Sequence, residues 1–87
     1  MDIQYKPSFV RDVKKASVEA QINLRDLIET LKSVQNLNDI TNLKKLKGHT
    51  NAYRIRVTNY RVGFYYENGS LIMVRFLPRK TIYRFFP

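Results

Sequence analysis

The chain has 87 residues, of which 44% are apolar, so residues 1–87 are expected to form a single domain with one modest core. It contains no cysteine, no membrane-length apolar run and no signal-peptide pattern, which excludes disulfides, thiol catalysis and cysteine-based zinc sites and favours a cytoplasmic protein. The net charge of +9 arises entirely from residues 44–87, whose ten basic side chains face one acid, Glu67, and this asymmetry favours nucleic acid over a membrane or an acidic protein.

The first half of the sequence predicts a short strand followed by two helices. Ile3 and Tyr5 alternate with polar neighbours, which is typical of a strand, and Pro7 ends it. Ser8 and Ser17 are each placed to cap the start of a helix. Apolar residues recur at helical spacing along both helices and are expected to pack on a sheet: Phe9, Val10, Val13, Ala16, Leu24, Leu27, Ile28, Leu31 and Val34.

Residues 36–48 are predicted to form a docked but irregular segment. The stretch is rich in turn-forming residues and ends at Gly48. Its apolar side chains are spaced to reach the core: Leu37, Ile40, Leu43 and Leu46. Three lysines decorate it, and they either contact phosphates or form a solvated rim: Lys44, Lys45 and Lys47.

From Ala52 onward the apolar period becomes two, which predicts strands near 52–58, 60–67 and 70–77 in an antiparallel meander. Asn68-Gly69 is a strong signal for a type I′ hairpin turn, and a two-residue turn at Thr58-Asn59 joins the first two strands.

These turns set the register of the predicted strands. Arg56 faces Arg61 and Arg54 faces Gly63, while on the last strand Ile72, Val74 and Phe76 face Tyr65, Gly63 and Arg61 in turn. One face of the sheet then forms the core under the helices: Tyr53, Ile55, Val57, Tyr60, Val62, Phe64, Leu71, Met73 and Leu77. Arg75 breaks this pattern, which indicates a bulge, an edge position or a register shifted by one residue.

The opposite face gathers Arg54, Arg56 and Arg61, and like charges opposed across strands destabilise a sheet. Such a face is either a solvated surface or a site for an anion, and the planar forks of arginine match phosphate. Gly63 leaves the centre bare for close approach, and Tyr65 is predicted, with Phe76, to stack on unpaired bases.

Four segments together resemble the RelE/ParE superfamily of toxins, over nearly the whole chain: Leu46-Lys47-Gly48, Tyr53-Arg54-Ile55-Arg56-Val57, Tyr60-Arg61-Val62 and Arg79-Lys80-Thr81-Ile82-Tyr83. The resemblance implies an α+β fold with a short N-terminal strand, two helices packed on a mainly antiparallel sheet and a C-terminal β-meander. It also implies an acidic antitoxin as partner, in a complex that sets the oligomeric state.

In its RelE branch the resemblance implies an endoribonuclease without metal or cofactor that cleaves messenger RNA in the ribosome through attack by the 2′-hydroxyl. The positions of Arg54, Arg56, Arg61 and Tyr83 belong to that catalytic site. This chain has arginines where the best-known members have lysines at two of these positions, and Pro78 where close relatives often have histidine. Because arginine is a poor base, Tyr83 or Tyr65 is the candidate for proton transfer.

Two other interpretations stay open. The chain could be a ParE-type toxin that inhibits DNA gyrase without nuclease activity, or a noncatalytic member that binds antitoxin or RNA. The full set of arginines with Tyr83 favours the nuclease.

The basic residues around the last segment are predicted to contact RNA or the antitoxin: Arg79, Lys80 and Arg84. His49, the only histidine, is predicted to be a surface loop residue, and the tail from Phe85 to Pro87 to pack on the core or meet the antitoxin.

Overall fold

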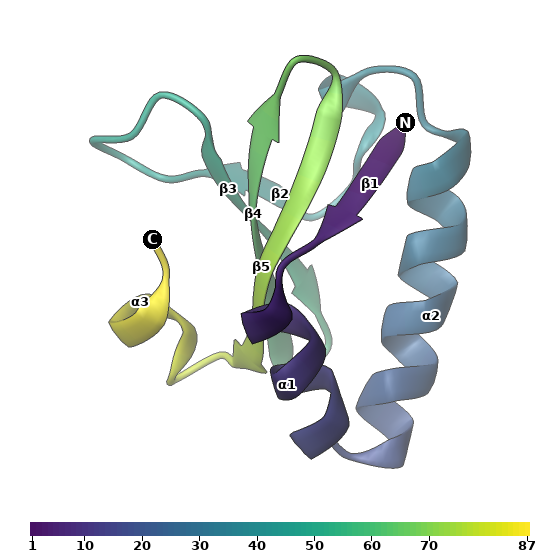
Figure 1. Ribbon diagram of the computed structural model, residues 1–87, viewed down its shortest axis with the longest axis vertical. Helices are drawn as coiled ribbons and strands as arrows, with labels where there is room; N and C mark the ends of the chain where they lie inside the picture. Colours follow the sequence, from purple (N-terminus) through teal and green to yellow (C-terminus); the bar gives the residue numbers. More distant parts are fainter.

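The computed structural model describes residues 1–87, which form a five-stranded sheet and three helices (Figure 1). A single 3₁₀ turn, Leu37–Asp39, precedes the second strand. None of the helices has the length and apolar character needed to span a bilayer. In chain order the strands and helices are β1 Asp2–Tyr5, α1 Pro7–Lys15, α2 Val18–Ser33, β2 Leu43–Lys45, β3 Ala52–Val57, β4 Tyr60–Glu67, β5 Ser70–Pro78 and α3 Ile82–Phe85.

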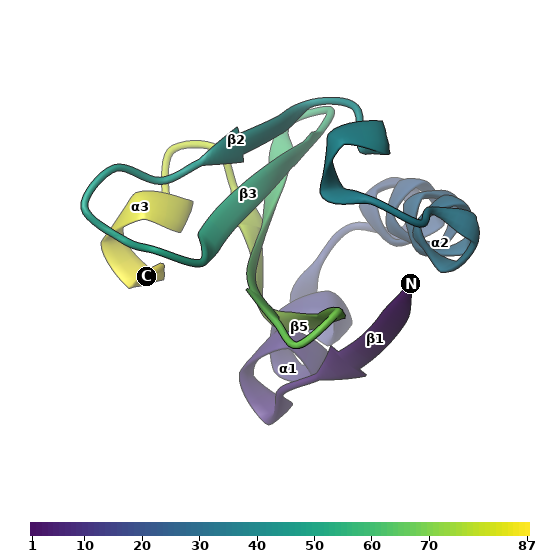
Figure 2. The ribbon, with the colours of Figure 1, turned by 90° about the horizontal axis from the view of Figure 1, so that it is seen from above.

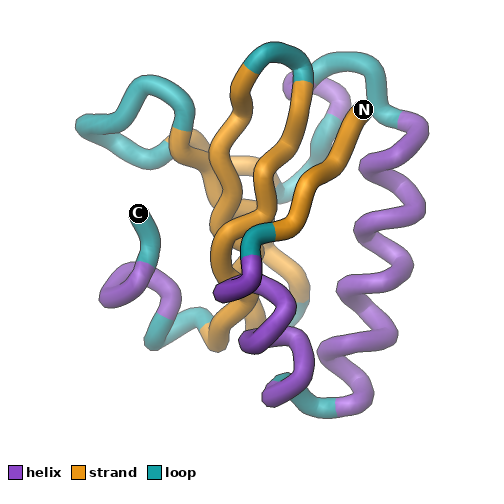
Figure 3. The backbone as a smooth tube through the Cα atoms, viewed as in Figure 1, coloured by secondary structure: helices purple, strands orange, loops and turns teal.

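The strands lie in the order β1-β5-β4-β3-β2, with β1 parallel to β5 and all other neighbours antiparallel. Helices α1 and α2 cover one face of this sheet (Figure 3). Their buried side chains, among them Phe9, Leu24 and Leu31, pack with Ile55, Val62 and other sheet residues in the main core. The predicted α+β arrangement of strand, two helices and meander is confirmed.

Of the two serines predicted to cap helices, only Ser17 does so. Ser17 caps α2 as predicted, because its side-chain oxygen accepts a hydrogen bond from the backbone N–H of Ala20 at 3.1 Å. The prediction that Ser8 caps α1 is wrong. Pro7 is already the first residue of α1, a position that suits its fixed φ and its missing N–H. The Ser8 hydroxyl instead donates to the carbonyl of Val74 on β5 at 2.5 Å.

The strand predictions for the second half are confirmed, with bounds that differ by at most one residue. Asn68 and Gly69 have φ angles of 51° and 80°, as a type I′ turn requires, and Thr58 takes φ 53° in the other tight turn. The segment before them is more regular than predicted. Leu43–Lys45 forms the edge strand β2, which pairs with β3, while Ile40 and Leu46 are buried as expected.

A β-bulge corrects the predicted register between β4 and β5. Tyr65 pairs with Ile72 as predicted, but the register then shifts so that Gly63 pairs with Arg75 and Arg61 with Leu77. The shift lies at Val74, which has no partner on β4. It turns Phe76 into the main core and Leu77 to the opposite face. The irregularity at Arg75 in the sequence was therefore the signature of a bulge.

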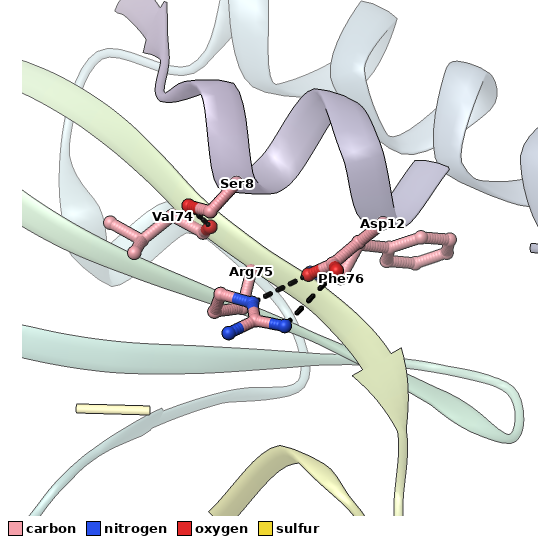
Figure 4. A network of polar contacts seen from close by, with 5 residues as sticks. All are labelled: Ser8, Asp12, Val74, Arg75 and Phe76. Carbon is pink, nitrogen blue, oxygen red and sulfur yellow. Dashed lines mark hydrogen bonds and ion pairs between the residues drawn. The ribbon is translucent and has the colours of Figure 1, made fainter. Parts of the chain in front are cut away.

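Helix α1 reaches the edge of β5 through Asp12, which is 8% exposed (Figure 4). The Asp12 carboxylate accepts two hydrogen bonds from Arg75, from Nε at 2.7 Å and Nη2 at 3.1 Å. It also accepts the backbone N–H of Phe76 at 3.0 Å. One carboxylate thus pairs a guanidinium and satisfies a buried strand N–H beyond the end of β1.

Replacing Asp12 tests this contact. Asp12→Ala should lower the free energy of unfolding by about 2 to 4 kcal/mol, because it leaves a buried N–H without an acceptor and Arg75 without its ion pair. Urea unfolding followed by circular dichroism measures the change. Glu29→Ala is the matched control, since its ion pair with Lys32 is well exposed and should be worth no more than about 0.5 kcal/mol. Similar losses in both variants would contradict the role given to Asp12.

Candidate active site

The arginine cluster consists of Arg54 and Arg56 on β3 and Arg61 on β4. Arg56 pairs directly with Arg61, and Arg54 pairs with Gly63, as the two-residue turn predicted. Because the alternate residues of both strands face the main core, these three side chains lie on the opposite face of the sheet. Helix α3 lies on that same side, away from α2 (Figure 2).

Asn42 holds two of the guanidiniums from the loop that leads into β2. Arg54 Nη1 donates to the backbone oxygen of Asn42 at 2.9 Å, and Arg56 Nη2 donates to its side-chain oxygen Oδ1 at 3.0 Å. Asn42 adopts φ 61°, a left-handed conformation that asparagine tolerates better than most residues. No local sequence pattern marks Asn42 as part of this site, because only the pairing of β2 with β3 brings it to the arginines.

Arg61 is buried, with 8% of its surface exposed, whereas the sequence predicts an open polar face at this position. Its Nη1 donates to the backbone oxygens of Thr58 at 3.0 Å and Tyr60 at 2.9 Å, so the guanidinium caps the turn between β3 and β4. Burial is the largest cause that lowers the pKa of Arg61, and the charge of Arg54 lowers it further, whereas Tyr83 acts in the opposite direction. Arginine nevertheless stays charged at neutral pH.

Tyr83 on α3 comes to the edge of this cluster, as its assignment to the same site requires. Its hydroxyl oxygen accepts a hydrogen bond from Arg54 Nε at 3.3 Å. The side chain is 55% exposed, so water and a ligand can both reach it. Residues separated by 29 positions in the sequence are thus brought into contact.

No carboxylate neutralises the arginine cluster. The two ion pairs of the chain, Glu29 with Lys32 and Asp12 with Arg75, both lie elsewhere. The acceptors that hold the three guanidiniums are neutral amide and carbonyl oxygens and the Tyr83 hydroxyl. The cluster therefore keeps its full positive charge in a fixed arrangement, which suits binding of an anion with several oxygens. No group of three or more acidic or histidine side chains is placed to hold a metal ion.

Some of the other basic residues predicted to bind RNA lie near this cluster. Lys44 pairs with Arg54 across β2 and β3 and shares its face. Arg79 is close enough to lower the pKa of Arg61 through its charge. Lys45 pairs with Tyr53, whose side chain packs on the main core, so Lys45 points to the other face.

The remaining basic residues are exposed and have no side-chain partner in the chain: Lys47, Lys80 and Arg84. His49 is exposed in the β2–β3 loop, as predicted.

The prediction of a bare centre at Gly63 is wrong, because the C-terminal tail covers it. The ring of Phe86 lies against Gly63, and Phe86 is only 2% exposed. Tyr65, predicted to stack on bases, packs against the same ring with centroids 5.2 Å apart. Phe76, given the same role, is in the main core on the other face, stacked on Tyr60. The aromatic part of the predicted RNA surface is thus used within the fold.

No family model matches the chain. The chain is 38% identical to Toxin RelE3 of Methanocaldococcus jannaschii over 88 residues, covering all of both proteins. It superposes with a TM-score of 0.82 on a chain of the RelB-RelE antitoxin-toxin complex from Methanococcus jannaschii, at 36% identity, covering 97% of this chain and 99% of that one.

A more distant structure shows the same fold. The match to the RelE-RelB complex from Pyrococcus horikoshii has a TM-score of 0.71 at 15% identity, covering 93% of this chain and 97% of that one. The full-length identity to Toxin RelE3 extends the likeness from fold to sequence. The chain therefore belongs to the RelE family of toxins from toxin–antitoxin systems.

Proposed function

We propose that the chain is an endoribonuclease that cleaves messenger RNA on the ribosome without a metal ion. The observation that carries this proposal is the arginine cluster, three guanidiniums held without any carboxylate beside the exposed hydroxyl of Tyr83. A phosphodiester that enters this face meets fixed positive charge on one side and a proton donor on the other.

In the proposed reaction the ribose 2′-hydroxyl oxygen attacks the adjacent phosphorus, and the bond from phosphorus to the 5′ oxygen breaks. The products are a cyclic phosphate and a free 5′-hydroxyl. Negative charge grows on the phosphoryl oxygens in the transition state, and preorganised cations stabilise such charge most effectively. Asn42 supports this step because it fixes the Arg54 and Arg56 guanidiniums before RNA binds.

Two protons move in this reaction, and Tyr83 is suited to deliver one. Because its oxygen accepts the N–H of Arg54, its own O–H is free to donate to the departing 5′ oxygen. The 2′-hydroxyl proton passes to water, which reaches this exposed site, and the phenolate is reprotonated from water. Tyr65, the other tyrosine considered, is packed against Phe86, so we assign proton transfer to Tyr83.

The active-site prediction uses Tyr83→Phe and Arg54→Ala. Each variant should reduce ribosome-dependent cleavage of a reporter message by about a hundredfold, the usual value of one acid–base group or one charge at a developing oxyanion. Both should stay folded, because neither side chain is buried. Arg61→Ala is a poorer test, since loss of the two carbonyl contacts of this buried side chain should cost about 1 to 3 kcal/mol of stability.

Controls come from the opposite side of the sheet. Tyr5→Phe and Arg11→Ala remove the same chemical groups from exposed positions on β1 and α1, and they should cleave like the parent. If the active-site variants remained as toxic and as active as these controls, the nuclease proposal would fail. Assay of gyrase supercoiling would then test the ParE-type alternative.

RNA binding should depend steeply on salt. Five cations lie in or beside the arginine cluster: Lys44, Arg54, Arg56, Arg61 and Arg79. If about five phosphates are neutralised, the affinity for single-stranded RNA should fall by about a hundredfold between 50 and 200 mM salt. Fluorescence anisotropy with a short labelled RNA measures this slope. A flat dependence would show that the charge of the second half does not serve nucleic acid.

We propose that the partner of this toxin is an acidic antitoxin that docks an amphipathic helix between α1 and α2. An apolar groove of about 460 Å³ lies there, lined by Tyr5, Phe9, Val10, Val13, Lys14, Gln21, Leu24, Arg25 and Ile28. Its two charged residues are both basic, so an apolar helix face with acidic edges is complementary to it.

Val10→Asp tests this docking mode. The substitution puts a carboxylate into the apolar groove, and we expect it to weaken the antitoxin complex at least about tenfold, since it buries an unpaired charge. Ile22→Asp is the control, because Ile22 is similarly exposed, 45% against 42% for Val10, but does not line the groove. Calorimetry with the antitoxin copurified from the native operon gives both affinities. Equal effects of the two variants would place the antitoxin elsewhere.

A further inference from the structure

Helix α3 is a single turn of four residues that cannot hold its own position. A helix this short is unstable in isolation, so tertiary contacts have to fix it. The contacts come from Ile82 and Phe86, which are 0% and 2% exposed and pack with Leu46 and Ala52 in a second hydrophobic cluster. The location of α3 therefore depends on where these two side chains lie on the sheet.

Gly63 makes the seat for Phe86. A Cβ atom at Gly63 would lie 2.5 Å from Cδ2 and 2.6 Å from Cγ of the Phe86 ring, closer than side-chain carbon atoms approach. Any other residue would push the ring away. Gly63 is also the β4 partner of Arg54 on β3, so the ring is anchored one strand away from a member of the arginine cluster.

Tyr83 lies on the turn that this anchor holds. Its side chain is exposed, and its one hydrogen bond is the contact with Arg54 Nε. A single hydrogen bond at a solvated position gives little positional restraint. The backbone of α3 supplies the rest, and the Phe86 N–H closes that turn on the carbonyl of Ile82 at 2.9 Å.

We infer that Phe86, seated on Gly63, is a positioning residue that sets Tyr83 against Arg54. The inference rests on the proposed function, in which Tyr83 transfers a proton during RNA cleavage. In this proposal Phe86 does not contact the RNA and acts only through the placement of α3. The glycine predicted from the sequence to admit a base thus admits a ring of the chain itself.

The test compares Phe86→Ala and Phe86→Leu with Phe85→Ala. Phe85 is the next residue along the chain but is 52% exposed, with the Arg75 guanidinium over its ring at 5.0 Å, so its removal leaves the seat on Gly63 intact. We expect Phe86→Ala to lower kcat by about a hundredfold, the same loss as Tyr83→Phe, with little change in KM. Phe86→Leu, which refills part of the seat, should recover part of the rate, and Phe85→Ala should match the parent.

The double variant Phe86→Ala/Tyr83→Phe separates positioning from a general loss of structure. If Phe86 acts through Tyr83, the double variant should be no slower than Tyr83→Phe alone, because residues that work as a unit are not additive. Losses that multiply would overturn the inference.

A nuclear Overhauser contact between the Tyr83 ring and the Arg54 side chain gives a readout independent of cleavage. It should be present in the parent and in Phe85→Ala and absent in folded Phe86→Ala; its persistence there would also overturn the inference. A parent chain that shows this contact but cleaves no RNA would refute the proposed function and leave the positioning itself supported.

Discussion

The β3–β4 pairing sets Arg56 directly opposite Arg61, and the geometry of the arginine cluster depends on that pairing being held against charge repulsion. Like charges at a directly opposed pair destabilise a sheet. Apolar contacts on the other face of the same two strands offset this repulsion. Val62 pairs there with Ile55, and the rings of Phe64 and Tyr53 stack with their centroids 5.5 Å apart. Apolar cross-strand pairs under the helices thus stabilise a strand register that the repulsion between Arg56 and Arg61 destabilises.

The hydrogen bonds of the arginine cluster orient its charges without cancelling them. A carboxylate in place of Asn42 would also fix Arg54 and Arg56, but it would neutralise the charge on which the proposed binding of a phosphodiester depends. The same distinction appears on β5, where Arg75 is paired with Asp12 and lies outside the cluster. The strands therefore carry one arginine paired with a carboxylate, Arg75, and three without one, and only the latter leave positive charge uncompensated on the sheet.

Much of this arrangement was predictable because it depends on local signals. Alternation along β3 and β4, with the two-residue turn at Thr58-Asn59, placed Arg56 opposite Arg61 and all three arginines on one face. What escaped prediction depends on contacts between distant segments. The bulge at Val74 moved Phe76 and Leu77 to faces opposite those expected, because one extra residue inverts the alternation after it. Asn42 and Phe86 reach the site only through β2 pairing and α3 docking, for which neither stretch carries a local pattern.

Lys6 and the start of α1 cover part of the backbone at the outer edge of the sheet. Beyond the end of β1, the outer edge of β5 is occupied by the Lys6 N–H on Met73, the Ser8 hydroxyl on Val74 and the Asp12 carboxylate on Phe76. At the opposite end of the sheet, β2 has only three residues, two of which are lysines. Covered, short and charged edges discourage the pairing of strands between molecules. The toxin should therefore resist edge-to-edge aggregation when it is released from its antitoxin.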